Sequence, residues 1–173
     1  MISYKKSIIK LQKSKIKIGN EIINSLDSLN RVSASNIFCG VDNPASNNAA
    51  FDGFAISSKD TKDLNKKNKR LFKILGTTAA GDKPFEKKVK RFQTIEIMTG
   101  GVIPKAFDTI IPIEQIIFYP NKKKPKFILI DKKLNKYQHI RFKGSDYKKK
   151  DLVIKKGTVL QLKEVKCWPV LYL

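Results

Sequence analysis

The sequence predicts a mostly β protein with a few short helices. From Phe51 to Gln115 short extended runs alternate with turn residues, which is typical of a compact β module. Two further extended runs, 116–119 and 127–130, flank a lysine-rich loop and predict a β-hairpin. Helical spacing of apolar residues is confined to short segments outside this β region.

The segments that precede the β region are expected to be partly helical. Tyr4, Ile8 and Leu11 fall near helical spacing, and Ser3 is suited to the N-cap position. A second short helix is expected over 25–30, followed by an extended segment that ends near Cys39. The stretch PASNNAA then forms an irregular connection into the β module.

Strands are expected at five places before the hairpin loop. Pro112 marks one of them as an edge strand or a bulge, because proline cannot donate a ladder hydrogen bond. The five cover residues 54–56, 71–75, 94–98, 108–113 and 116–119. Beyond the hairpin, DLVIKKGTVL predicts a strand, a turn at Gly157 and a second short strand. A helix is expected to begin near Gln161, ahead of an apolar stretch that needs a surface to cover it.

The formal net charge of +21 points first to nucleic acid or to an anionic surface. Only four of the 36 basic residues are arginine, the side chain preferred for bidentate phosphate and base contacts. The lysines are interleaved with turn residues, which favours a solvated surface over a specific nucleic-acid interface. Nucleic-acid binding stays open as an alternative function.

No apolar run is long enough to span a bilayer, and the N-terminus lacks the pattern of a signal peptide. Cys39 and Cys167 lie far apart, and His139 is the sole histidine, so neither a disulfide framework nor a zinc site is expected. We expect a cytoplasmic protein that contains two buried thiols and does not associate with membranes.

Three glycine-containing turns carry the candidate chemistry. AAFDGFA places Asp52 before Gly53, a pair suited to a turn in which glycine takes a positive φ and the carboxylate caps nearby N–H groups. TTAAGDKP repeats this arrangement with Asp82. IMTGGVIP follows a predicted strand, and its paired glycines 100–101 beside Thr99 are typical of an amide nest for an oxyanion. Each turn taken singly is as well explained by local structure, with Asp52 as a cap and Thr99 as a strand-end hydroxyl.

Taken together and in this order, the turns resemble a known family. The stretches NNAAFDGFAI, GTTAAGDKP, IMTGGVIPKAFDTIIPIEQ and IRFKGSDYKKKDLVIKKGTVLQLKEV are similar to the molybdopterin molybdenumtransferases, the MoeA and gephyrin E-domain proteins. The resemblance runs from about Ser25 to Val165.

The resemblance implies an elongated, L-shaped pair of domains. Residues 1–50 plus 138–173 would form a dimerisation and linker domain, and residues 51–137 an inserted β domain. The implied partner is a second copy of the chain in a homodimer, with no specific nucleic acid.

The family reaction inserts molybdate into adenylylated molybdopterin, releases AMP and requires a divalent metal such as Mg²⁺. By resemblance the catalytic residues are Asp52 and Thr99. An ionised carboxylate repels molybdate, so Asp52 is expected to act through a metal ion, a water or donors that it orients. Substrate and oxyanion binding are assigned to Gly53, Gly100, Gly101 and Asp82.

Two departures from the family pattern bear on function. The family has an aromatic residue, Asp, Asn and Ser where this chain has Ser46, Asn47, Asn48 and Ala49, so that one carboxylate and one hydroxyl are missing. The family's next domain, which carries the TGDE-type motif and most of the pterin pocket, would begin where CWPVLYL stops. The resemblance therefore implies the N-terminal portion of an insertase, inactive without C-terminal domains or a split partner chain. The alternative is a non-catalytic dimeric scaffold or basic binding module of the same fold.

Overall fold

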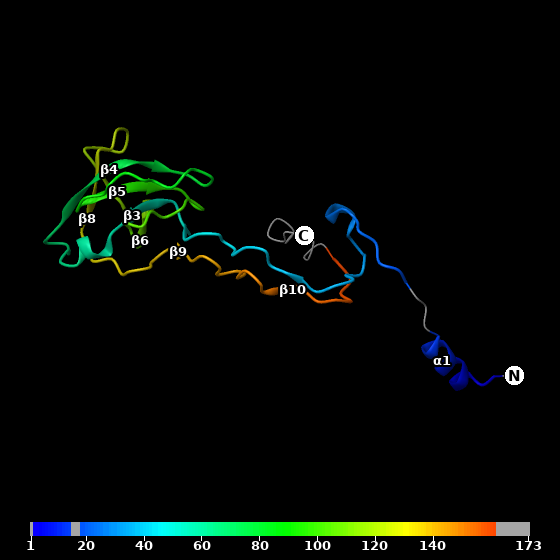
Figure 1. Ribbon diagram of the computed structural model, residues 1–173. Coiled ribbons are helices and arrows are strands. Elements are labelled where there is room, and N and C mark those ends of the chain that lie inside the picture. The colour runs from blue at the N-terminus through cyan, green and yellow to red at the C-terminus, as the bar shows by residue number, and fades with distance from the viewer. Residues whose placement is uncertain (1, 15–17, 162–173) are drawn as a thin grey trace. The chain divides into compact units, whose positions relative to one another are not determined.

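The computed structural model describes residues 2–14 and 18–161 (Figure 1). Internal contacts divide these residues into two compact units, one formed by 2–37 with 153–161 and the other by 38–152. The division predicted from the sequence, 1–50 plus 138–173 against 51–137, concerns the family's domains and stays a prediction. The predicted helix near Gln161 and Cys167 lie outside the described residues.

The first unit contains the predicted N-terminal helix. Helix α1 spans Tyr4–Lys13, and the hydroxyl of its N-cap Ser3 accepts a hydrogen bond from the amide of Lys6. The helix expected over 25–30 is shorter, a single 3₁₀ turn η1 at Ser25–Asp27. Gly157 has the positive φ of a turn, +84°. The strand expected after it is reduced to an isolated bridge between Val159 and Val32.

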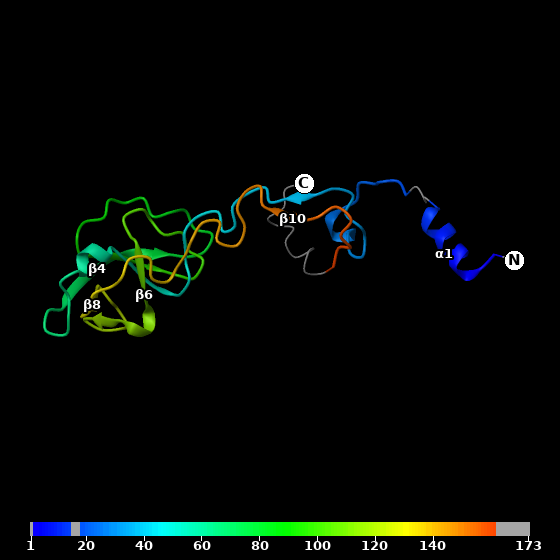
Figure 2. The ribbon, with the colours of Figure 1, turned by 90° about the horizontal axis from the view of Figure 1, so that it is seen from below.

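The second unit is built on a six-stranded sheet with the order β6-β3-β5-β4-β8-β7. Figure 1 labels five of these strands, β3, β4, β5, β6 and β8, and Figure 2 shows the same ribbon from below. Its strands are β3 (Gly53–Ile56), β4 (Arg70–Thr78), β5 (Gln93–Ile97), β6 (Thr109–Pro112), β7 (Ile117–Tyr119) and β8 (Phe127–Ile130). Strand β3 is antiparallel to both β5 and β6, whereas β4 and β5 are parallel. The predicted hairpin of β7 and β8 is confirmed, and β6 with Pro112 is an edge strand as predicted.

Several short elements lie outside this sheet. The 3₁₀ turns η2 (Ser58–Thr61) and η3 (Ile113–Gln115) follow β3 and β6. Strand β2 (Asn48–Ala49) pairs with β9 (Ile140–Arg141), and β1 (Ile37–Phe38) with β10 (Leu152–Ile154). Pairing of β2 with β9 brings the segment just before the Asp52 turn beside residues about 90 positions later in the chain.

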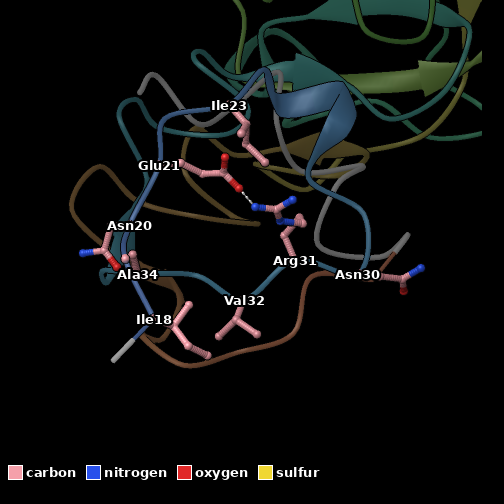
Figure 3. Close-up of a pocket in the computed structure, with 9 residues that line it drawn as sticks. Ile18, Asn20, Glu21, Ile23, Asn30, Arg31, Val32 and Ala34 are labelled. Atoms are coloured by element: carbon pink, nitrogen blue, oxygen red, sulfur yellow. Dashed lines mark ion pairs between the residues drawn. The ribbon is translucent and has the colours of Figure 1, made fainter. Parts of the chain in front are cut away.

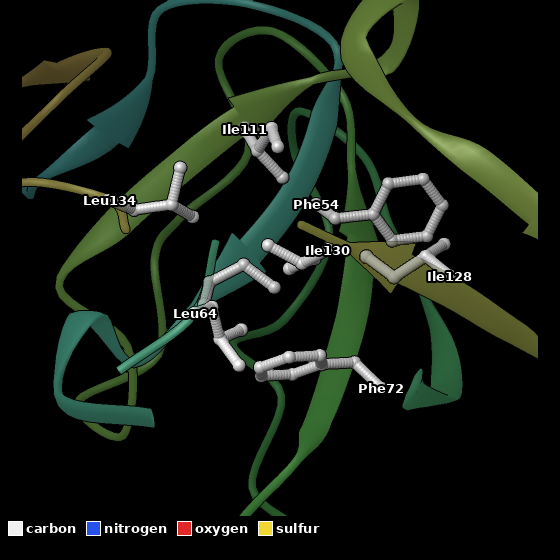
Figure 4. Packing of buried hydrophobic residues seen from close by; sticks show 8 residues of the cluster. Phe54, Leu64, Phe72, Ile111, Ile128, Ile130 and Leu134 are labelled. Atoms are coloured by element: carbon white, nitrogen blue, oxygen red, sulfur yellow. The ribbon is translucent and has the colours of Figure 1, made fainter. Parts of the chain in front are cut away.

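Both faces of strand β3, which lies next to the edge strand β6, are buried. Because side chains alternate along a strand, Phe54 and Ile56 enter one cluster and Ala55 enters the other. The first cluster is drawn in Figure 4, and its buried members are Phe54, Ile56, Leu64, Phe72, Ile111, Ile128, Ile130 and Leu134. Each large apolar side chain buried there contributes about 1.5–3 kcal/mol to the free energy of unfolding. Burial on both faces therefore stabilises β3 within the sheet.

The fold is mostly β with one α-helix in the described part of the chain, as predicted. No helix among residues 2–14 and 18–161 is long and apolar enough to cross a bilayer. The side chain of Cys39 is buried, as expected.

Candidate functional site

The structure brings the two predicted catalytic residues into direct contact. The amide of Thr99 donates to Oδ1 of Asp52 at 2.6 Å, and the Thr99 hydroxyl donates to the same oxygen at 2.7 Å. Both residues are exposed. The contact joins residues 47 positions apart in the sequence and leaves them open to a ligand.

Sheet topology explains why these residues meet. Asp52 immediately precedes β3, and Thr99 lies two residues beyond the end of β5. Because β3 and β5 are antiparallel, the start of one lies beside the end of the other, with Gly53 opposite Ile97. The carbonyl of Asp52 also accepts from the amide of Ile113 at 3.0 Å, which attaches the same turn to the segment after β6.

Gly53 is required for a reason that the sequence did not indicate. The prediction that Gly53 has a positive φ is wrong. In the described part of the chain, the glycines with positive φ are 81, 100, 144 and 157. A Cβ at Gly53 would instead lie 2.1 Å from the carbonyl oxygen of Ile111. Glycine is therefore needed so that β6 can approach the start of β3.

The amide nest expected at Gly100 and Gly101 is occupied by the protein's own carbonyls. The Gly100 amide donates to the carbonyl of Ala49 at 2.9 Å, and the Gly101 amide to that of Met98 at 2.9 Å. Gly100 does have the predicted left-handed backbone, with φ of +82°. The expected amide nest is therefore a closed turn in the structure. Its two amides already donate to backbone oxygens, so they are not available to an oxyanion. Contact of the two glycines with substrate stays a prediction.

The second glycine turn lies against the same loop. The Met98 amide donates to the carbonyl of Thr78 at 2.9 Å, and a Cβ at Gly100 would lie 3.2 Å from the Cβ of Ala80. The exposed carboxylate of Asp82 accepts from the Ala79 amide at 2.7 Å, which closes this turn. All three predicted turns therefore converge on residues 98–101, with Asp82 acting as a local cap whose role toward substrate stays a prediction.

The hydrogen bonds from Thr99 favour the ionised form of Asp52. The Thr99 hydroxyl, and then the Thr99 amide, lower the pKa of the Asp52 carboxyl below its ordinary value, against a smaller opposing effect of desolvation. Within the described residues, no group donates to the other carboxylate oxygen, Oδ2. The pair therefore presents hydrogen-bond acceptors, a carboxylate oxygen and the lone pairs of the hydroxyl, and suits a cation or a donor group.

A divalent cation fits this donor set in one respect. Mg²⁺ is usually held by one or two carboxylates together with waters and substrate phosphates, so a single open carboxylate oxygen can serve. No group of three or more His, Cys, Asp or Glu side chains that could hold a metal occurs in the described parts of the chain. Asp52 could thus supply one ligand, and the rest would come from water or substrate.

The backbone role of Ala49 was missed by sequence reasoning, which noted only the hydroxyl that its side chain lacks. Its carbonyl accepts from Gly100, and its amide donates to the Gly101 carbonyl at 2.9 Å, so its backbone clamps the Asp52 segment to the Thr99 loop. Asn47 supports the same segment, since its side-chain oxygen accepts from the Lys143 amide at 2.9 Å. A buried alanine carries no chemical signal, and only its place in the sequence pattern could have drawn attention to it.

The first unit contains a hollow of its own, and none of the predicted site residues lines it. It has a volume of about 420 Å³ and is lined by residues that include Ile18, Ile23 and Val32 (Figure 3). Glu21 and Arg31 form an ion pair across it. The candidate chemistry therefore resides in the second unit, at the Asp52–Thr99 contact.

Comparison with known proteins identifies the same family that the sequences of the three turns resemble. A family model described as MoeA N-terminal region (domain I and II) matches residues 2–168. The chain belongs to this family. The MoeA N-terminal region thus accounts for nearly all of the sequence, in both units.

Two curated relatives are named molybdopterin molybdenumtransferase. That of Staphylococcus epidermidis is 31% identical over 156 residues, which are 90% of this chain and 36% of the relative. That of Staphylococcus aureus is 33% identical over 133 residues, which are 77% of this chain and 30% of the relative. The chain therefore spans about a third of the length of these relatives.

Solved structures of MoeA proteins share the fold. A molybdopterin biosynthesis MoeA protein from Pyrococcus horikoshii OT3 matches with a TM-score of 0.77 and 28% identity, over 87% of this chain and 38% of that one. A second MoeA structure from Pyrococcus horikoshii matches with a TM-score of 0.81 and 27% identity, over 98% of this chain and 42% of that one.

Proposed function

We propose that this chain serves as the N-terminal part of a molybdenum insertase, in which Asp52 and Thr99 help to insert molybdate into adenylylated molybdopterin with release of AMP. The observation that supports this most strongly is their direct contact at exposed positions beside the start of β3 and the end of β5. The names of the relatives support a transfer of molybdenum to molybdopterin. The family resemblance suggests the two residues, and their contact supports a joint role.

Asp52 works in this proposal as an ionised acceptor. Its negative charge repels molybdate and phosphate oxygens, so it does not contact them directly. The Thr99 hydroxyl donates its hydrogen bond to Asp52. It therefore holds the Asp52 carboxylate in position and does not donate to an oxyanion. When Mg²⁺ is bound, it would offset the charge between Asp52 and the anionic substrates. The protein's contribution is to hold Oδ2 in place and to keep it deprotonated.

Activity is proposed to require further domains. The chain aligns with only about a third of the length of the curated relatives. The remaining substrate contacts would come from the portion that corresponds to the rest of those relatives. Assembly as a homodimer and a cytoplasmic location belong to the same proposal.

A non-catalytic scaffold is the second candidate, and one observation favours it. Asn47 and Ala49 stand where the family pattern has a carboxylate and a hydroxyl. Here the Asn47 oxygen serves a backbone amide and Ala49 is buried. Both positions therefore stabilise the fold without offering an exposed ionisable group.

A fusion protein can decide between the two. Residues 1–168, up to the end of the family match, are joined to the portion of the Staphylococcus epidermidis relative that follows the corresponding region, and AMP release is measured with adenylylated molybdopterin, molybdate and Mg²⁺. We expect activity that falls at least about 10-fold in Asp52→Ala. The matched control is Asp63→Ala, which removes an exposed carboxylate outside the site and should leave the rate unchanged. A folded fusion that releases no AMP favours the scaffold.

A further inference from the structure

Asp52 and Gly53 form the single Asp–Gly step of the sequence, which has no Asn–Gly step. In such a dipeptide the glycine amide nitrogen can attack the side-chain carboxyl carbon of the aspartate, because glycine has no side chain to obstruct the approach. The new bond to nitrogen replaces the bond to a carboxyl oxygen, which leaves as water with the amide proton, and a cyclic imide forms. Water then opens the imide at either carbonyl. One product is isoaspartate, in which the backbone runs through Cβ.

The carboxyl group that would be attacked is held by the loop after β5. Oδ1 of Asp52 accepts from the amide of Thr99 at 2.6 Å and from its hydroxyl at 2.7 Å. Hydrogen bonds to a charged group are among the stronger ones in proteins, so the side chain keeps this orientation. Rotation of the carboxyl group toward a nucleophile on its own backbone requires both bonds to break.

The attacking amide of Gly53 is also engaged. The carbonyl of Asp52 accepts from the amide of Ile113 at 3.0 Å, so it points toward the segment after β6. Because the two groups of a trans peptide point in opposite directions, the Gly53 N–H points toward β5, where Ile97 is its ladder partner. The nitrogen must lose its proton to react, and an amide inside a ladder meets water only after local opening.

Close packing around Gly53 prevents the backbone from bending into the ring. A Cβ at this position would lie 2.1 Å from the carbonyl oxygen of Ile111 and 3.0 Å from the Cα of Pro112. Ring closure would turn the Asp52–Gly53 peptide out of the sheet, away from β5 and β6 together. The glycine that allows β6 to approach is thus the residue that makes the dipeptide reactive once the sheet opens.

We propose that Asp52 is a latent isoaspartate site, which the fold protects while the Asp52–Thr99 contact and the start of β3 are intact and which reacts when this part of the sheet opens. Isoaspartate inserts an extra atom into the backbone, so Gly53 could not stay opposite both Ile97 and Pro112. The carboxylate would also leave Thr99. The modification would therefore remove the charged acceptor that the structure places at this position.

Ageing of the 173-residue chain at physiological temperature and neutral pH tests this proposal. Isoaspartate at Asp52 is quantified by peptide mapping with mass spectrometry, and the synthetic peptide NNAAFDGFAI supplies the rate of the same step without a fold. We expect the rate in the folded chain to be at least about 10-fold lower than in the peptide. Thr99→Val should raise the rate in the chain at least about threefold, because one of the two bonds is lost. Thr99→Ser keeps the hydroxyl and should age like the wild type.

Two controls separate local opening from other causes. The exposed Asp27–Ser28 step should isomerise at the same rate in the wild type and in both variants, since Thr99 does not contact it. Hydrogen exchange of the Gly53 amide, followed by NMR, should be slow in the wild type. Equal ageing rates of Asp52 in the wild-type chain and in the peptide would overturn the proposal, and this comparison needs no variant. Equal rates in Thr99→Val and the wild type would overturn it as well.

Discussion

Thr99 donates two hydrogen bonds to one oxygen of Asp52, from its amide at 2.6 Å and from its hydroxyl at 2.7 Å. Two donors on one oxygen lower the pKa of the carboxyl and hold its position. The second oxygen, Oδ2, accepts no hydrogen bond from the described residues. Asp52 could be explained as a turn cap from its local sequence, and in the structure it is also a charged hydrogen-bond acceptor at the protein surface.

Removing the Thr99 hydroxyl should raise the pKa of Asp52. In Thr99→Val only the amide bond remains, so the pKa should move part of the way back to its ordinary value. The measurement is an NMR titration of the Asp52 side-chain carboxyl carbon. Thr99→Ser keeps the hydroxyl and is the matched control. A pKa that is identical in the valine and serine variants would contradict the account.

The Asp52 charge should make stability depend on pH. Its pKa is lower in the folded protein than in the unfolded chain, where it is about 3.9, so the unfolded state binds the proton first. The stability gained from the charge is therefore fully present above about pH 5 and is lost as pH falls through the lowered pKa. Urea unfolding of the wild type and Asp52→Asn should differ at neutral pH and converge in acid. A difference that grows toward low pH would have the wrong sign.

Gly53→Ala should destabilise the second unit. Its Cβ would lie 2.1 Å from the Ile111 carbonyl oxygen, and backbone on both sides would have to move. We expect a loss of roughly 1–3 kcal/mol or more in the free energy of unfolding. Gly19→Ala is the control, because no atom lies within 4 Å of its added Cβ and its φ is not positive. Denaturant unfolding measures both variants, and equal stability of the two would refute the close approach of β6.

Phe72 should be among the residues that contribute most to stability. It is fully buried in the cluster of Figure 4 and packs edge-on against Phe92 at 5.6 Å between ring centroids. Phe72→Ala should lower the free energy of unfolding by about 3–5 kcal/mol. Phe51→Ala removes the same atoms from a side chain that is 52% exposed, and its cost should be far smaller. Comparable losses would mean that the cluster is not the core.

Much of the fold follows from local sequence signals. The strands at 54–56, 71–75 and 94–98 were expected because short apolar runs are bounded by turn residues, and they correspond to β3, β4 and β5. The parallel pairing of β4 with β5 was not expected. It depends on contacts between segments that are distant in sequence, for which neither propensity nor alternation provides a signal.

The candidate site was predictable only in part. Asp52 and Thr99 were chosen from family resemblance, and nothing in their local sequence shows that they touch. The reasons given for two glycines were wrong or incomplete. Gly53 avoids a steric overlap with Ile111 rather than adopting a positive φ, and the Gly100 amide is used by Ala49. Both errors arise because a neighbouring strand, absent from the local sequence, determines what each glycine is for.

A double-mutant cycle in the fusion protein tests the central claim that Asp52 and Thr99 act as one unit. AMP release is compared for wild type, Asp52→Asn, Thr99→Val and the double variant. If Thr99 acts through Asp52, each single change should lower the rate, and the double variant should be no slower than Asp52→Asn. Effects that multiply in the double variant, or single variants as active as the wild type, would contradict the account.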